Sequence, residues 1–146
     1  MIGREDQLKS LNQNYASSKS NLTILYGRHG TGKTTLIKEF IKDKKSFYYK
    51  AVPADDFEQN GMFGRAAGVE SDSYYEIMKT LRDRGIILFV VEEFHNIIKT
   101  DSDFMSDVSR LVRDESKVMV ILSCSSVAWV ENSMVKAMGN LSLIHI

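Results

Sequence analysis

Gly27–Thr34 reads GRHGTGKT, a complete G-x-x-x-x-G-K-[ST] pattern of the kind that forms phosphate-binding loops. Glycines in such a loop allow backbone N–H groups to turn inward around phosphate oxygens. Lys33 then reaches the β- and γ-phosphates, and the Thr34 hydroxyl can ligate Mg²⁺. The residues predicted to bind the phosphates are Gly27, Arg28, His29, Gly30, Thr31, Gly32, Lys33, Thr34 and Thr35.

The residues on both sides of the loop predict the strand and the helix that a phosphate loop requires. Leu22–Tyr26 is a short apolar run of β-prone residues that ends at Gly27. After Lys33, apolar residues recur at helical spacing, at Leu36, Ile37, Phe40 and Ile41. This order directs a helix N-terminus, the positive end of its dipole, at the anion. The alternative, an ordinary glycine turn that happens to carry Lys-Thr, does not account for this context.

The composition is that of one ordinary globular domain of 146 residues, with 43% hydrophobic and 26% charged residues. The formal net charge is zero, which argues against a broad nucleic-acid-binding surface. The single cysteine, Cys124, excludes an intramolecular disulfide and suits a reducing compartment. The longest fully apolar run, Ile86–Val91, is too short to span a bilayer, and the N-terminus has no secretory signal. We therefore expect a cytoplasmic protein.

Strand and helix patterns alternate along the chain. Leu8, Leu11 and Tyr15 predict a first helix. After the loop and its helix, we expect strands over 46–52, 86–91 and 118–122, and helices around 74–81, 104–112 and 127–138. Residues 53–72 contain three glycines and a proline and predict a loop with at most a short helix. The alternation predicts an α/β domain with a parallel sheet, whose ligands bind at the carboxyl ends of the strands.

A second candidate element of the site is the acid pair Glu92-Glu93, which ends the apolar run Ile86–Val91. A hydrophobic strand that ends in acids is typical of a Walker B site, where one carboxylate holds Mg²⁺ and another can activate the attacking water. We assign Glu92 to the magnesium position and Glu93 to water activation, as the catalytic residue together with Lys33. The alternative is a solvated strand end of no special role.

The polar cluster 123–126, Ser-Cys-Ser-Ser, follows the last predicted strand. A residue there can lie near the γ-phosphate, and Ser123 is the first candidate and Ser125 the second. Capping of a helix by Ser125 or Ser126 is an equal alternative. Cys124 lies beside an apolar strand, which predicts a buried thiol rather than a nucleophile. His29 and His95 lack metal-ligand spacing, so we expect each to face solvent or to contact residues that themselves bind the ligand.

Taken together, these residues resemble the archaeal-type, AAA-like P-loop ATPases that are related to the STAND group. Ile2-Gly3-Arg4-Glu5 is similar to the G-R-E box of that family. Leu25–Arg28 is similar to the family's residues that lead into the phosphate loop. Val91–His95 is similar to the acidic strand end of the family. Ile121–Ser126 is similar to its strand with a terminal serine cluster. The resemblance covers nearly the whole chain.

The resemblance implies a P-loop NTPase three-layer sandwich that binds ATP and Mg²⁺ and hydrolyses ATP. It also implies that Ile2, Gly3 and Arg4 lie near the adenine. One departure is Glu92, because the family has an aspartate there and the longer side chain should weaken or retune metal binding. A GTPase is disfavoured because no N-K-x-D or T-K-x-D box is present, and the acid pair favours water activation over a small-molecule kinase.

The end of the chain is a further departure from the family pattern. Residues 141–146, LSLIHI, resemble translated sequencing adapter, so we take 1–140 as the P-loop domain and 141–146 as a candidate non-native tail. On this interpretation the fifth strand and the C-terminal helical region are missing, although the tail could instead pair as a makeshift fifth strand. The exposed edge invites self-association, and a downstream effector module is the other expected partner.

Two hypotheses for the function remain open at this point. One is an enzyme that hydrolyses ATP. The other is a nucleotide-dependent switch with negligible turnover in isolation, which is favoured if no arginine reaches the γ-phosphate. Arg110 and Arg113 are the candidates for such an arginine, with a position on a helix surface as the default.

Overall fold

The computed structural model describes residues 4–98, 103–114, 116–126, 128, 130 and 141–146. Five parallel strands form one sheet in the order β2-β3-β4-β1-β5. The strands are β1 (Asn21–Tyr26), β2 (Ser46–Lys50), β3 (Leu88–Glu92), β4 (Met119–Cys124) and β5 (Leu141–His145). The predicted α/β fold with a parallel sheet is therefore confirmed.

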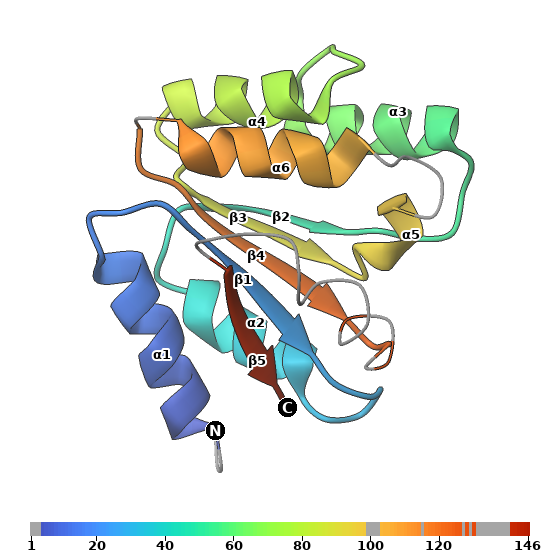
Figure 1. Ribbon diagram of the computed structural model, residues 1–146. Helices are drawn as coiled ribbons and strands as arrows, with labels where there is room; N and C mark the ends of the chain where they lie inside the picture. The colour runs from blue at the N-terminus through green and yellow to red at the C-terminus, as the bar shows by residue number, and fades with distance from the viewer. Residues whose placement is uncertain (1–3, 99–102, 115, 127, 129, 131–140) are drawn as a thin grey trace.

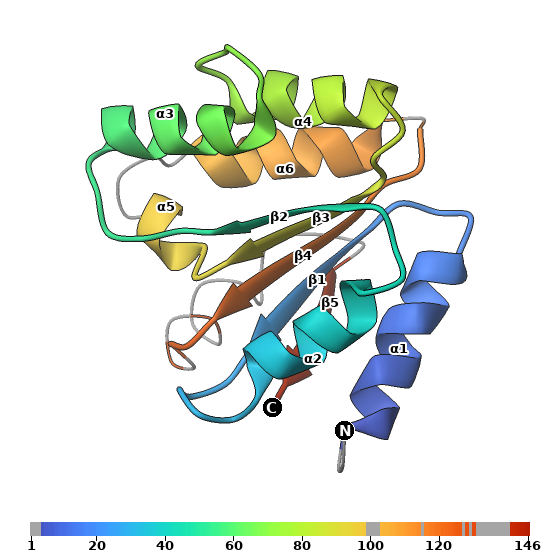
Figure 2. The same ribbon diagram turned by 180° about the vertical axis from the view of Figure 1, so that it is seen from behind.

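Helices cover both faces of the sheet and make the molecule a three-layer sandwich (Figures 1 and 2). One face carries α1 (Glu5–Ala16) and α2 (Lys33–Ile41). The other face carries α3 (Asp56–Ala67), α4 (Tyr74–Asp83), the short α5 (His95–Ile98) and α6 (Asp103–Arg113). Each face has its own buried apolar cluster, because successive side chains of a strand point to opposite faces.

The alternation along β3 and β4 decides which way the predicted site residues point. Val90 and Ile121 are buried in the cluster beneath α2. Glu92 and Ser123 lie two residues further along the same strands and are direct register partners. Because the side-chain period of a strand is two, both face the layer of α2, the helix that begins at the phosphate loop.

The expectation of a mostly irregular segment over 53–72 is wrong, because α3 occupies twelve of its residues. The Asp55 carboxylate caps the helix by accepting a hydrogen bond from the Glu58 N–H at 2.8 Å. Gly68, with φ +70°, ends it in the left-handed conformation. Gly64 is needed inside the helix, because a Cβ there would lie 2.9 Å from the Val69 carbonyl oxygen. Thus two of the glycines that suggested a loop belong to a helix: Gly68 ends it, and Gly64 lets the Val69 carbonyl approach its backbone.

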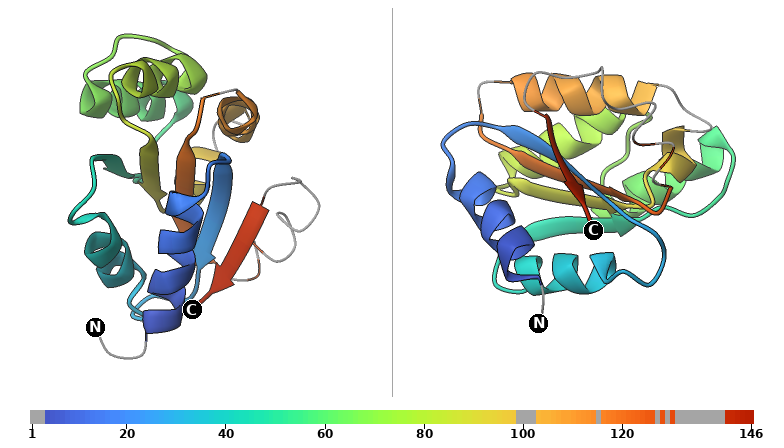
Figure 3. Two further views of the ribbon diagram at one scale, coloured as in Figure 1. Left: turned by 90° about the vertical axis from the view of Figure 1, so that its left-hand side faces the viewer. Right: turned by 60° about the horizontal axis from the view of Figure 1, so that its bottom comes forward.

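A fifth strand is present, so the prediction that it is missing is also wrong. Leu141–His145 pairs in parallel with Leu22–Tyr26 of β1 at the edge of the sheet (Figure 3), as the makeshift pairing anticipated. Two strand ends also differ from expectation: β2 ends at Lys50, and β4 continues through Ser123 and Cys124. The helix predicted over 127–138 falls almost wholly outside the described residues.

Phe63 is expected to be a main source of stability for the layer that contains α3. It is fully buried, with ring centroids 5.3, 5.1 and 5.0 Å from those of Phe47, Tyr49 and Tyr74. Phe63→Ala should lower the free energy of unfolding by about 3–5 kcal/mol, measured by urea denaturation. Phe57→Ala on the same helix is the control, because Phe57 is 86% exposed. Equal losses in the two variants would contradict this packing.

Candidate functional site

The phosphate loop and the carboxyl ends of β2 and β3 line a cavity of about 530 Å³, and Ser123 at the end of β4 is not among the lining residues. This volume is within the usual range for small-molecule sites, about 300–1,000 Å³. Its wall brings together predicted residues that are far apart in sequence, namely His29, Gly30, Gly32, Lys33, Thr34, Thr35, Glu92 and Glu93. The segment 50–53 and Asn96 complete the wall and were not predicted.

The phosphate loop has the backbone geometry that anion binding requires. Gly30 and Gly32 adopt φ +84° and +91°, which disfavours any residue with a Cβ. Gly32 is the N-cap of α2, with no side-chain cap and no acid in the first turn of the helix. The N-terminus of α2 therefore faces the cavity, and no acid of the helix's own first turn offsets its positive dipole end.

Lys33 is largely buried and lies under the loop. Its ammonium donates to the carbonyl oxygens of Gly27 at 2.6 Å and Arg28 at 3.0 Å. An ammonium has three donors, so one is left for a phosphate oxygen. The Thr31 hydroxyl donates to the same Arg28 carbonyl at 2.8 Å and closes the turn.

Arg4 also lies against the loop, where its guanidinium donates to the Thr31 carbonyl. This contact adds positive charge beside the N-terminus of α2. The predicted proximity of Arg4 to adenine stays a prediction. Ile2 and Gly3, predicted with it, lie outside the described residues.

The predicted magnesium residues meet directly. The Thr34 hydroxyl donates to Glu92 Oε1 at 2.9 Å, and Glu92 is only 2% exposed. Glu92 Oε2 accepts a hydrogen bond from the hydroxyl of Tyr48, a residue that sequence reasoning missed. Among the described residues no group of three or more His, Cys, Asp or Glu could hold a metal alone. A hydroxyl and one carboxylate fit Mg²⁺, which takes few protein ligands and completes its shell with water and phosphate oxygens.

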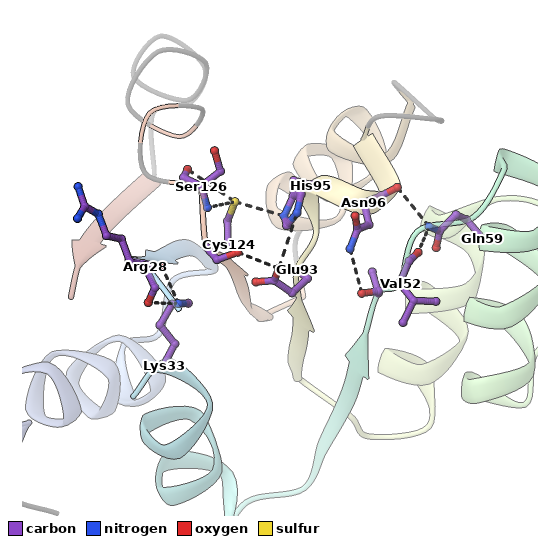
Figure 4. A network of polar contacts seen from close by, with 12 residues as sticks. Arg28, Lys33, Val52, Gln59, Glu93, His95, Asn96, Cys124 and Ser126 are labelled. Carbon is purple, nitrogen blue, oxygen red and sulfur yellow. Dashed lines mark hydrogen bonds and ion pairs between the residues drawn. The ribbon is translucent and has the colours of Figure 1, made fainter. Parts of the chain in front are cut away.

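Glu93 lies immediately past the end of β3 with φ +55°, the sole positive φ of a non-glycine residue in the described ranges. A left-handed residue of this kind costs about 1–2 kcal/mol and is often found at functional sites. Its carboxylate accepts a hydrogen bond from Ser125 Oγ at 3.0 Å and lies 3.7 Å from His95 Nε2. The other ring nitrogen of His95 lies 3.4 Å from the buried Cys124 sulfur (Figure 4). The backbone turn thus separates Glu93 from Glu92, and the Glu93 carboxylate is oriented by Ser125, which follows β4, and by His95 of α5.

Ser123 lies between Leu25 of β1 and Glu92 of β3 in the sheet register. It is 1% exposed, and no described residue hydrogen-bonds to its hydroxyl. A buried hydroxyl without a partner is costly, which suits a group that meets a ligand or water. The prediction that Ser123 senses the γ-phosphate remains a prediction.

The rear wall of the cavity depends on two amides that the sequence did not single out. Asn96 Nδ2 donates to the Ala51 carbonyl at 3.2 Å. Gln59, fully buried on α3, donates to the Asn96 carbonyl at 3.2 Å and also to that of Val52 (Figure 4). These bonds connect the residues that follow β2 to α5, the helix that begins shortly after Glu93. Gln59 lay in the segment taken for a loop, so no pattern marked it.

A family model supplies the decisive comparison. The model of the ATPase family associated with various cellular activities (AAA) matches residues 23–143. The chain belongs to the AAA family. The predicted family and its nucleotide-binding ATPase core are thereby confirmed.

Individual proteins and solved structures are also similar to this chain. An uncharacterized ATP-binding protein of Methanocaldococcus jannaschii is 46% identical over 44 residues, 30% of this chain and 75% of the relative. A longer uncharacterized protein of the same archaeon is 26% identical over 136 residues; the match takes in 87% of this chain but only 30% of the relative. In the structure of Drosophila ORC bound to DNA, a chain with 16% identity superposes with a TM-score of 0.70, covering 99% of this chain and 43% of that one. This last likeness concerns the fold alone.

The left-handed glycine at the start of α2 should be required for nucleotide binding. Gly32→Ala places a Cβ at φ +91°, and the strain of about 1–2 kcal/mol should weaken binding of a fluorescent adenine nucleotide roughly tenfold. Gly61→Ala is the matched control, because a methyl inside α3 meets only the flexible end of Arg65. Unchanged affinity in Gly32→Ala would show that this loop does not hold the phosphates.

Proposed function

We propose that this AAA core binds ATP with Mg²⁺ and hydrolyses it to ADP and phosphate by cleaving the bond between the β- and γ-phosphates. In this proposal the loop amides and Lys33 bind the β- and γ-phosphates, while Thr34 and Glu92 hold the metal. Glu93 orients and deprotonates the attacking water. Magnesium, when bound, neutralises charge on the phosphate oxygens. The ATP-binding description of the archaeal relative supports adenine as the base.

One observation carries the proposal. The Thr34 hydroxyl and the Glu92 carboxylate hydrogen-bond at 2.9 Å, so the loop and the acidic strand end form one site. Glu93 follows Glu92 directly and lines the same cavity. A metal-side acid and a second, differently oriented acid within one cavity supply a partner for Mg²⁺ and a candidate base for the attacking water.

The second candidate, a switch with negligible turnover alone, is favoured by the position of the arginines on α6. Arg110 stacks on the Tyr75 ring, with its guanidinium carbon 3.8 Å from the ring centroid. Arg113 ends α6 and precedes the amino end of β4, whereas the phosphate loop lies at the carboxyl ends. An arginine that reaches the γ-phosphate is worth about 10³–10⁵ in rate, so another chain segment or a neighbour would have to supply it.

Several finer points belong to the same proposal. Contact of residues 2–4 with adenine, relation to the STAND group and a downstream effector module are proposed by resemblance. So is the division into a domain over 1–140 and a non-native tail over 141–146. Self-association was expected at an unpaired edge of β1, and because β5 pairs with β1 it is proposed at the edge that β5 presents. No described helix is long and apolar enough to cross a membrane; a cytoplasmic location remains proposed.

Glu93→Gln should separate hydrolysis from binding. The amide keeps the size of the side chain and one acceptor oxygen for the Ser125 hydroxyl, but it cannot accept the proton of water. Phosphate release should fall by about 10²–10⁴-fold while the affinity for ATP stays within about twofold. Release is followed by a coupled phosphate assay, and affinity by equilibrium binding with Mg²⁺ present.

Lys33→Ala is the control for the site itself and should abolish ATP binding, because the phosphates lose their cation. If Lys33→Ala bound ATP as well as the parent chain, the site would be wrongly assigned. If the parent bound ATP but released no phosphate above the Glu93→Gln background, the switch would replace the enzyme as the better account.

A further inference from the structure

Tyr48 contacts the predicted magnesium acid although no motif accounts for it. It lies on β2 opposite Val90, and Lys50 lies opposite Glu92, so Tyr48 and Glu92 are diagonal neighbours on one face of the sheet. The Tyr48 hydroxyl donates to Glu92 Oε2, while Thr34 donates to Oε1. Each oxygen of the carboxylate is therefore fixed from a different element, β2 on one side and α2 on the other.

We propose that Tyr48 is a positioning residue that orients the Glu92 carboxylate for Mg²⁺. The role rests on the proposed function, since it concerns the same metal position. With Oε2 engaged by the phenol, Oε1 is the oxygen that faces Thr34 and is available to the cation or to its water. A glutamate side chain has one more rotatable bond than an aspartate side chain. Without the phenol, only Thr34 holds the Glu92 carboxylate, and rotation about that bond can change the direction of its oxygens.

Tyr48 is itself well placed for this task. Its ring packs against the apolar cluster beneath α2, and the Lys38 ammonium lies 5.5 Å from the ring centroid. Lys38 is one helical turn after Thr34, so α2 contacts both the phenol and the carboxylate. Burial, together with the adjacent Glu92 carboxylate, raises the pKa of Tyr48. A phenol is protonated at neutral pH in any case, so the hydroxyl of Tyr48 is the donor in its bond to Glu92.

A merely structural role would have a different signature. If Tyr48 only filled space or satisfied a buried acid, removal of its hydroxyl would change folding stability and leave the metal dependence of binding unaltered. A positioning role predicts that removal of the hydroxyl raises the Mg²⁺ concentration needed for binding. This effect should occur only when residue 92 is a glutamate, because a shorter side chain does not reach the phenol. The two roles can therefore be separated by combining changes at both positions.

The test is a double-mutant cycle of Tyr48→Phe and Glu92→Asp on the whole chain, read out by binding rather than turnover. Mg²⁺ is titrated at a fixed concentration of fluorescent ATP analogue, and nucleotide affinity is measured separately in EDTA. Tyr48→Phe should raise the Mg²⁺ concentration at half-saturation about tenfold, the lower end of the range for residues that orient metal ligands. Affinity in EDTA should stay within about twofold of the parent. In the Glu92→Asp background the same change should have less than about a twofold effect, because the shorter carboxylate does not reach the phenol.

Tyr49→Phe is the matched control, since Tyr49 is the next residue of β2 but points into the opposite core. It should not alter the Mg²⁺ dependence. Thermal unfolding of each variant checks that the fold is kept. An equal shift in both Glu92 and Asp backgrounds, or no shift in the Glu92 background, would overturn the role of Tyr48. If Lys33→Ala bound nucleotide like the parent, or the parent bound none, the proposed function would fail and the role of Tyr48 with it.

Discussion

The parallel register of β1, β4 and β3 is the constraint on which the rest of the structure depends. Ser123 pairs with Leu25 on one side and Glu92 on the other, so three strands end at the same level. The phosphate loop begins one residue after β1, and the acids end β3. The hydrogen bond of 2.9 Å between Thr34 and Glu92 follows from this alignment. A slip of one residue in β3 would turn Glu92 away from α2.

Much of this arrangement was predictable because the signals were local. The glycines of residues 27–34 were expected to let the loop backbone turn inward, and Gly30 and Gly32 adopt left-handed conformations in the structure. The apolar runs before Gly27 and Glu92 indicate strands buried on both faces, which must be parallel and covered by helices. Strand ends of a parallel sheet meet at one edge, so the loop, the acid pair and Ser123 were expected together.

What could not be predicted depends on which elements become neighbours. That β2 lies beside β3 brings Tyr48 to Glu92, and no periodicity encodes this pairing. Helix α3 was missed because Gly64 lowers helix propensity, and tertiary contact with the Val69 carbonyl overrides that preference. Gln59 lies on this helix, so its role in the site was not predicted either. The edge strand β5 was predicted to be absent because its sequence looked foreign, with pairing of the tail as the alternative. The alternative holds because an unpaired edge of β1 is a template for a β-prone segment such as 141–145.

The central claim is that one nucleotide site joins the loop to the ends of β3 and β4. Hydrogen–deuterium exchange of the chain with and without ATP and Mg²⁺ tests it most directly, because it reports where binding occurs. The account predicts protection concentrated at Gly27–Thr34, with a second region at Glu92–Glu93 and a third at Ser123–Ser125. Protection confined to other segments, or the same pattern of exchange with and without ATP under conditions where ATP is bound, would contradict it.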